Sequence, residues 1–179
     1  MRILRNKNWN QKKNFIFYPT SKSIVELLNK DITFLKKKSR SNPLKKGRLC
    51  IHSNIKDDIH QMIIYHSKGT YIRPHKHFNK EESYLLLQGE MDVVLFDNKG
   101  NVTKVIKMGN LRSKKIFFFR MKKSIFRTLI MKKDSIFLEI KQGPFTKKNV
   151  IWASWSPDID NEIDSKIFLK DLKKEIGKI

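Results

Sequence analysis

One polar stretch, residues 69–89, contains the side chains of this chain that are best suited to chemistry. It reads GTYIRPHKHFNKEESYLLLQG and holds two of the five histidines, His75 and His77, followed by Glu82. On a β-strand, residues two apart share a face, so both imidazoles point to one side and Lys76 to the other. Two imidazoles and a carboxylate from the next strand offer N, N and O ligands to a divalent transition metal. The pattern predicts a metal site; the competing interpretation is a solvated polar loop.

Short apolar or alternating runs separated by turn residues surround this stretch. They predict strands at 48–52, 60–66, 71–77, 83–89, 91–96, 102–108, 116–120, 125–130 and 135–143. The sequence DNKG at residues 97–100 is typical of a hairpin loop. Many short strands with no helices between them favour a closed antiparallel fold. We therefore expect a small antiparallel β-barrel or jelly roll.

Amphipathic segments before and after the strands predict two flanking helices. In the first, Ser23 and Glu26 form a capping-box pattern, and Asn42 ends the helix because proline follows it. The apolar residues at helical spacing in this segment are Ile24, Leu27, Leu28, Ile32 and Leu35. The expected class is therefore all-β with an N-terminal and a C-terminal helix.

The C-terminal helix is expected to pack on the outside of the barrel, with Asp160 or Asn161 as its cap. Its predicted apolar face comprises Ile163, Ile167, Leu172 and Ile176. A β-like run, NFIFYP at residues 14–19, precedes the first helix. We expect three regions: an N-terminal strand and helix extension at 1–45, the β-barrel at 46–157 and the C-terminal helix at 158–179.

The amino-acid composition limits the classes of protein to which this chain can belong. The 179 residues, 39% of them hydrophobic, suffice for one domain with a real core. No apolar run is long enough to cross a bilayer, the basic N-terminus lacks a secretory pattern, and the single Cys50 cannot form an internal disulfide. These features predict a cytoplasmic protein. The net charge of +22 comes from lysines scattered along the chain without a nucleic-acid-binding motif, so we expect no specific nucleic-acid partner.

The spacing within the polar stretch resembles the first motif of the cupin superfamily. That motif is a glycine, a His-x-His pair, a glutamate and a second glycine at set intervals, and Gly69, His75, His77, Glu82 and Gly89 match it. The resemblance implies a cupin fold, in agreement with the predicted barrel. It also implies that the two histidines and the glutamate are metal ligands.

A narrower resemblance covers roughly residues 48 to 157 and concerns the WbuC family of small cupin metalloproteins. The residues that carry it are Pro74, the pair Glu82-Ser83, the FDNKG hairpin, Arg120 after an aromatic run, Gly143-Pro144-Phe145 and Trp155. This family is associated with bacterial surface-polysaccharide (O-antigen and capsule) gene clusters. The resemblance implies a divalent transition metal (Fe, Mn, Zn or Ni) and a sugar-related substrate.

The chain departs from that family at one position. Arg127 stands where the second cupin motif usually supplies a histidine, and arginine has no lone pair for a metal. A guanidinium about 5 Å from a divalent cation is opposed by about 6–7 kcal/mol at an effective dielectric constant of about 20. Either Arg127 swings away and leaves a two-histidine, one-carboxylate metal site, or it enters the pocket, pairs with Glu82 and abolishes metal binding. The resemblance leads us to favour the first arrangement.

Other residues are candidates for the same pocket. His52 and Tyr71 are the predicted catalytic residues, and Arg73 is a predicted lining residue because it is in register with the histidine pair. For His52 the competing interpretation is a strand-edge histidine hydrogen-bonded to backbone. His60 and His66 flank one strand, and one of them is expected to approach the interior.

Two further charged residues complete the predicted site. Arg120 is a candidate for binding a carboxylate or phosphate, and its alternative is a structural ion pair with Glu139. Glu81 does not fit the motif spacing and is expected to face outward or to support the site from behind.

Three function classes follow. The first is a metal-assisted or histidine-assisted isomerase or epimerase acting on a sugar or nucleotide-sugar. The second is a metal-free binding module in which Arg127 and Arg120 capture an anionic sugar or carboxylate. The third is non-specific polyanion binding driven by charge. From the cupin resemblance we also expect a homodimer, formed through an edge strand or a sheet face.

Overall fold

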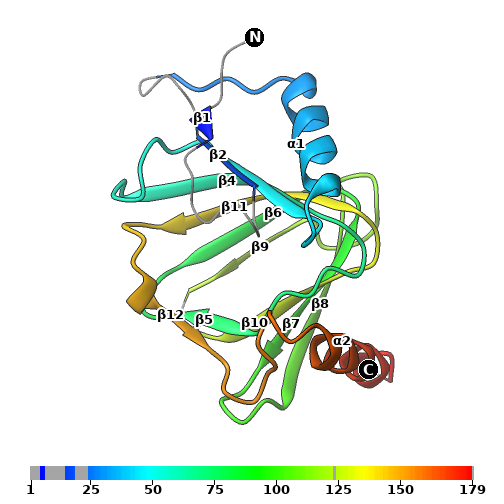
Figure 1. The fold of residues 1–179 in the computed structure, drawn as a ribbon. Coiled ribbons are helices and arrows are strands. Elements are labelled where there is room, and N and C mark those ends of the chain that lie inside the picture. Colours follow the sequence, from blue (N-terminus) through cyan, green and yellow to red (C-terminus); the bar gives the residue numbers. More distant parts are fainter. Residues whose placement is uncertain (1–4, 7–14, 19–23, 123, 179) are drawn as a thin grey trace.

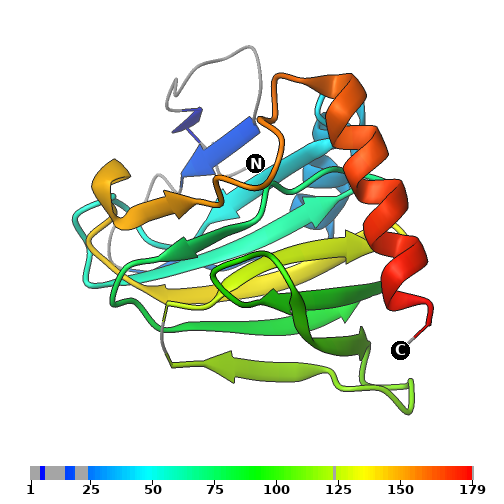
Figure 2. The same ribbon diagram turned by 90° about the horizontal axis from the view of Figure 1, so that it is seen from below.

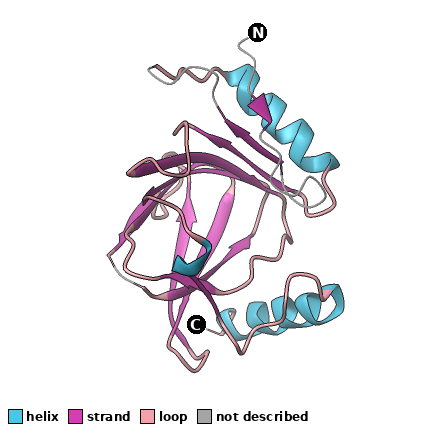
Figure 3. Ribbon diagram, turned by 60° about the vertical axis from the view of Figure 1, so that its left-hand side comes forward, coloured by secondary structure: helices cyan, strands magenta, loops and turns pink. Residues whose placement is uncertain are grey.

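The protein, in a computed structural model that describes residues 5–6, 15–18, 24–122 and 124–178, consists of two facing β-sheets flanked by two helices (Figures 1 and 3). The seven-stranded sheet contains, in order, β1 (Arg5–Asn6), β2 (Phe15–Tyr18), β3 (Lys46–Cys50), β4 (Ile59–His66), β11 (Ser135–Gln142), β6 (Glu82–Gln88) and β9 (Phe118–Met121). The five-stranded sheet contains β12 (Val150–Trp152), β5 (His75–His77), β10 (Phe126–Met131), β7 (Glu90–Phe96) and β8 (Val102–Gly109). The helices are α1 (Asn29–Ser41), α2 (Glu162–Ile176) and the short 3-10 helix η1 (Lys147–Asn149).

The predicted fold class is confirmed, because this arrangement is a cupin-like β-sandwich with an N-terminal and a C-terminal helix. Its strand pairs are antiparallel with one exception, since β2 runs parallel to β3. The hairpin between β7 and β8 forms at DNKG as predicted: Asp97 accepts backbone hydrogen bonds from Lys99 and Asn101. Gly100 takes a positive φ of +97° there, which a residue without Cβ adopts at little cost.

Three apolar clusters hold the layers together. The first fills the space between the sheets and includes Met62, Tyr84, Val93, Leu129 and Phe137. The second packs α2 against the outer face of the five-stranded sheet, where Figure 2 shows the helix in orange and red. The third packs α1 against the outer face of the seven-stranded sheet. Because α2 covers part of the outer face of the five-stranded sheet, β10 is buried at every position.

The first helix begins later than predicted. It starts at Asn29, after the backbone N–H of Leu28 donates to the Asp31 carboxylate at 2.7 Å. Ile24 and Leu28 are exposed, and the expected cap Ser23 lies outside the described residues. The predicted end at Asn42 is confirmed. The helix therefore starts five residues later than the periodicity predicts, because Asp31 provides a capping group at Leu28 that the sequence pattern does not single out.

The C-terminal helix is capped at Asn161, as predicted, through a hydrogen bond from the backbone N–H of Asp164 to its side chain. Its buried face contains Leu169, Leu172 and Ile176. The prediction that Ile163 and Ile167 share this face is wrong, since both are more than half exposed. The helix therefore buries a narrower stripe than its apolar residues suggest. Within the described residues, no helix is long and apolar enough to span a bilayer.

The strand that carries the histidine pair is shorter than predicted. Of the expected strand at 71–77, only His75–His77 form a strand, β5, and residues 71–74 have no regular structure. On its other edge β5 pairs with β12, which the sequence pattern does not predict because the run VIW is only three residues long. In the five-stranded sheet β5 therefore lies between β12 and β10.

Candidate functional site

The histidine pair and Glu82 meet between the two sheets. His75 and His77 come from β5 of the five-stranded sheet, and their ring centroids lie 5.3 Å apart. Glu82 opens β6 of the opposite sheet and is 1% exposed. The distance from His77 Nε2 to Glu82 Oε1 is 2.9 Å. The alternation argument thus places the three side chains correctly relative to one another.

Arg127 enters the same space. It pairs with His75 in the register between β10 and β5, and it is 1% exposed. Its Nη1 donates to the backbone carbonyl of His75 at 2.7 Å, and its Nη2 donates to both carboxylate oxygens of Glu82, at 2.6 Å to Oε1. Of the two arrangements foreseen for Arg127, the structure adopts the one in which it pairs with Glu82.

The buried pair fixes the charge of the site. Burial alone would raise the pKa of the Glu82 carboxyl, but Arg127 and His77 outweigh it and hold that pKa far below its usual range. Burial opposes the charge of Arg127 as well, yet Glu82 and Tyr84 raise the pKa of the guanidinium overall. For His75, burial and the neighbouring Arg127 lower the pKa well below its ordinary value. The centre therefore holds a carboxylate, a guanidinium and neutral imidazoles.

These residues do not fit a metal ion in this arrangement. Both oxygens of Glu82 accept from Arg127, and they also accept from His77 Nε2 and from the hydroxyl of Tyr84 at 3.1 Å. A nitrogen that donates to a carboxylate has no lone pair for a metal. His75 Nδ1 is 2.8 Å from the Arg73 carbonyl, so on that ring the nitrogen left to bind a metal is Nε2. In the part of the chain that the structure describes, no three His, Cys, Asp or Glu side chains are grouped to hold a metal.

A cavity of about 390 Å³ opens from this centre between the sheets. Its basic lining residues are Lys46, Arg48, Arg73, Arg127 and Lys141. Glu139 is the acidic residue of the lining, and Lys141 pairs with it at 3.4 Å. Phe145 and Trp152 contribute apolar surface. An interior with this excess of positive charge favours an anionic guest.

Arg73 lies in this cavity, where it forms an ion pair with Asp158 and stands over the ring of Trp152 at 5.5 Å. Tyr71 does not join it. Its hydroxyl donates to the carbonyl of Pro157 at 2.9 Å, and its ring lines a separate cavity of about 480 Å³ beside α2. Burial raises the pKa of Tyr71 to about 12. The two residues diverge because residues 71–74 are not a strand, so alternation does not apply to them.

His52 lies away from the histidine pair. It stacks on His60 with ring centroids 4.1 Å apart, and its Nδ1 is 3.1 Å from the carbonyl of Gln61. This is the backbone-bonded interpretation that the sequence analysis kept open. Strand β3 ends at Cys50, two residues earlier than predicted, so His52 does not continue the face that lines the cavity.

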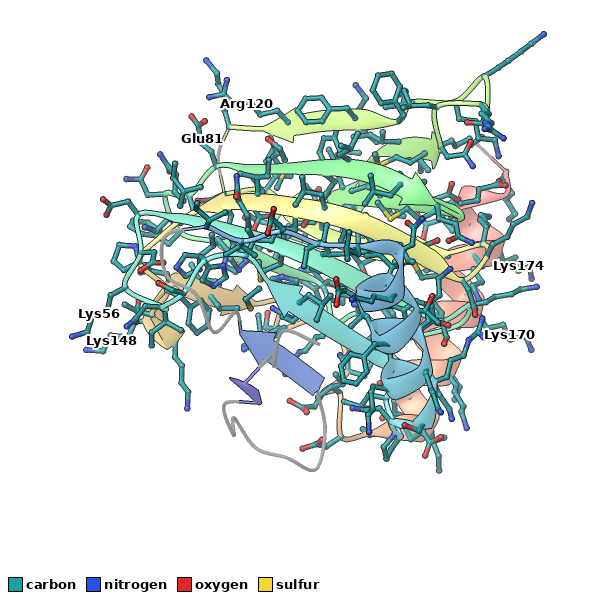
Figure 4. All side chains as sticks on the ribbon, turned by 90° about the horizontal axis from the view of Figure 1, so that it is seen from above. Lys56, Glu81, Arg120, Lys148, Lys170 and Lys174 are labelled. Atoms are coloured by element: carbon teal, nitrogen blue, oxygen red, sulfur yellow. The ribbon has the colours of Figure 1, made fainter. Side chains whose placement is uncertain are left out.

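Arg120 lies on the outside of the sandwich. It is on the edge strand β9 and pairs with Glu81, its Nε donating at 3.0 Å, as Figure 4 shows at the rim of the sheet. The alternative prediction, an ion pair of Arg120 with Glu139, is wrong, because Glu139 pairs with Lys141. The predicted outward position of Glu81 is confirmed. Neither residue contacts the cavity, so the substrate-binding role foreseen for Arg120 has no support from its position.

Several lining residues were not singled out from the sequence. They are Lys46, Lys141, Phe145 and Trp152. The spacing of Lys46 and Arg48, two residues apart at the start of a predicted strand, was a usable signal for two cations on one face. Trp152 gave no such signal, because its strand was not predicted. His66 is the histidine of the Ile59–His66 strand that approaches the interior.

The lysines outside the cavity are widely distributed. Figure 4 shows Lys56 and Lys148 at one end of the molecule and Lys170 and Lys174 at the other. A spread of this kind matches the scattered pattern in the sequence, whereas a nucleic-acid site concentrates its cations on one face.

Comparison with known proteins adds a family region and a fold likeness. A family model described as a domain of unknown function (DUF6016) matches residues 27–108, which is less than half of the chain. No curated protein matches the sequence.

Several solved structures resemble the fold. A protein from Shewanella oneidensis has 14% identity and a TM-score of 0.45 over 54% of this chain and 63% of its own. Oxalate decarboxylase from Bacillus subtilis has 15% identity and a TM-score of 0.42, over 55% of this chain and 24% of its own. A cupin superfamily protein from Desulfitobacterium hafniense has 15% identity and a TM-score of 0.41, over 53% of this chain and 76% of its own. All these scores are below 0.5, and the fold assignment above rests on the sheet topology of the chain itself.

Proposed function

We propose that the cavity binds a small organic anion, a carboxylate or an anionic sugar, and that Arg127 supplies the buried positive charge in place of a metal ion. The observation that carries this proposal is the buried Arg127–Glu82 pair, which occupies the centre where His75 and His77 converge. Arg127 Nε is buried and has no hydrogen-bond partner within the described structure. It is therefore a donor that a guest can satisfy.

The wall of the cavity suits a ring-shaped ligand. Trp152 is half exposed, with its ring 5.1 Å from that of His75 and Arg73 stacked over it. An exposed aromatic face beside polar groups can hold the apolar face of a sugar while the polar groups orient it. The resemblance to the WbuC family favours an anionic sugar of surface-polysaccharide metabolism as the guest.

A metal-dependent isomerase or epimerase, the other function suggested by the sequence, requires open ligand positions on Glu82 and His77. Both groups are engaged with protein partners. The geometry supports recognition of a ligand better than metal-assisted turnover, and we propose binding as the function.

A thermal-shift screen followed by calorimetric titration tests the proposal. The panel contains simple carboxylates, sugar acids, neutral sugars and divalent cations with and without chelator. Anions that bind the folded state raise the melting temperature, so we expect stabilisation by sugar acids and no effect of divalent cations or chelator. Stabilisation by a divalent ion that a chelator reverses, with no response to anions, would overturn the proposal.

Two variants on the same short strand locate the binding site. Trp152→Ala removes the aromatic surface inside the cavity, whereas Ile151→Ala truncates a residue outside the lining. We expect Trp152→Ala to reduce sugar-acid affinity and Ile151→Ala to leave it unchanged. Equal affinity in both would show that the ligand binds elsewhere.

A further inference from the structure

The seven-stranded sheet places three basic side chains together in the cavity wall opposite β5. Lys46 on β3 pairs with His66 on β4 in the strand register, and Arg48 follows two residues later on the same face. All three line the 390 Å³ cavity. Lys46 and His66 are buried, at 8% and 5% exposure. We call Lys46, Arg48 and His66 the β3–β4 basic cluster.

Among the residues that the structure describes, this cluster differs from the other cations of the cavity in having no carboxylate partner. Arg73 pairs with Asp158, Arg127 with Glu82 and Lys141 with Glu139. Within the described residues, neither Lys46 nor Arg48 forms an ion pair; the polar contact of Arg48 is with Met62 Sδ at 3.7 Å.

The members of the cluster act on one another instead. Burial and the charge of Arg48 lower the pKa of Lys46 to about 8. Burial, followed by Lys46 and Arg48, lowers the pKa of His66 well below its usual value. His66 Nδ1 is buried and has no hydrogen-bond partner in the described structure. Buried charges and unsatisfied donors are unfavourable unless a partner is supplied, and the described part of the protein supplies none here.

We infer that the β3–β4 basic cluster is an oxyanion subsite that holds the carboxylate or phosphate group of the cavity's ligand. The inference rests on the proposed ligand-binding function and adds where the anion lies. Lys46 and Arg48 provide charge-assisted hydrogen bonds, and His66 provides a neutral donor when Nδ1 carries the proton. Trp152 and the Arg127 centre then face the remainder of the ligand.

Calorimetric titration of the full chain with three probes tests the subsite. The probes are glucuronate, which carries a carboxylate, glucose 6-phosphate, which carries a phosphate, and neutral glucose. The variants are Arg48→Gln and Lys46→Met, and the matched control is Lys107→Met on the exposed face of β8. Loss of a hydrogen bond to a charged group corresponds to about 10-fold or more in affinity.

We expect glucuronate or glucose 6-phosphate, whichever the subsite accepts, to bind Arg48→Gln and Lys46→Met about 10-fold more weakly than wild type. Lys107→Met should bind it normally. Lys46→Met should also melt at a higher temperature than wild type without ligand, because an uncompensated buried charge is removed. Arg48→Gln, at a less buried position, keeps the test valid if Lys46→Met does not fold.

The outcomes separate the two proposals. If an anionic sugar binds wild type and both variants equally, the subsite is refuted while the ligand-binding function stands. If neither anionic probe binds wild type, both proposals fail. If glucose binds as tightly as the anionic probes and the variants are unaffected, the cavity recognises the ring alone and the subsite is again refuted.

Discussion

Arg127 Nη2 lies 2.6 Å from Oε1 of Glu82, and neither side chain is more than 2% exposed. This contact joins the two sheets, since Arg127 belongs to β10 and Glu82 to β6. Removing one member of a buried ion pair leaves an uncompensated charge, which costs about 3–5 kcal/mol. We expect Arg127→Met to lower the free energy of unfolding by about that amount, as measured by urea denaturation.

The double variant Arg127→Met/Glu82→Leu provides the control for this prediction. Replacing both partners with apolar side chains removes the unpaired charge, so most of the lost stability should return. A double variant as unstable as the sum of the two single variants would show that the residues do not stabilise each other.

Metal content is the second prediction. Because Glu82 and His77 are engaged with protein groups, protein purified without chelators should contain little divalent metal, and His75→Ala should contain the same amount. Arg127→His removes the guanidinium and its hydrogen bonds to both Glu82 oxygens and adds an imidazole opposite His75, so this variant should take up metal. Elemental analysis checks all three proteins. Stoichiometric metal in wild type that disappears in His75→Ala would restore the sequence-based ligand assignment.

The third prediction is that the folded state loses stability at acid pH because of His60. His60 stacks on His52, and burial and then His52 lower the pKa of His60 to about 4. The unfolded chain then binds protons at a higher pH than the folded one, so stability is full above about pH 6.5 and falls as the pH drops toward 4. Lys141 and Asp57 are the other charged neighbours, and they act in opposite directions.

His60→Gln isolates this contribution. Melting temperatures measured from pH 7 to 4 should fall less steeply for His60→Gln than for wild type, while the exposed control Arg112→Gln should follow wild type. Glu82, whose pKa is lowered by Arg127 and His77, stays ionised in the folded protein; its contribution to stability declines only below the ordinary carboxyl pKa of 4.5, where the unfolded chain takes up the proton, so it affects mainly the acid end of the range. Parallel curves for His60→Gln and wild type would show that His60 titrates normally in the folded protein.

Alkaline pH provides the fourth prediction, which concerns ligand binding. Lys46, with its pKa lowered to about 8, loses its proton in the free protein as the pH rises through that value. An anion that depends on Lys46 should therefore bind more weakly at pH 9 than at pH 7. Titrations in Lys46→Met should show no such decline. A wild-type affinity that is constant over this range would argue that Lys46 does not hold the anion.

The fifth prediction compares the two motif glycines. Gly69 and Gly89 both have positive φ, +81° and +92°. A Cβ on Gly69 would meet nothing within 4 Å, whereas one on Gly89 would lie 2.3 Å from the carbonyl oxygen of Asp134. We expect Gly69→Ala to cost about 1–2 kcal/mol for the left-handed backbone, and Gly89→Ala to cost more because backbone must move. Equal unfolding free energies for the two variants would contradict this.

The sequence was sufficient for features that depend on local pattern. Alternation located the long strands and put His75 and His77 on one face, and Asp97 to Gly100 identified a hairpin. Alternation failed at Tyr71, because residues 71–74 are irregular, and at the unpredicted β12 with Trp152. Short segments take their structure from the neighbours they pair with, and this information is not local.

By itself, the sequence determined that this chain forms short strands between two helices and that two histidines and a glutamate lie at the spacing of the first cupin motif. The tertiary structure decided what those residues do, because it set Arg127 opposite His75 and within hydrogen-bond distance of Glu82. It also brought Lys46, Arg48 and His66 into the same cavity, where no described carboxylate forms an ion pair with them. The physical reason is that charge compensation depends on distances across two packed sheets, and residues far apart in the chain set those distances only when the sheets close.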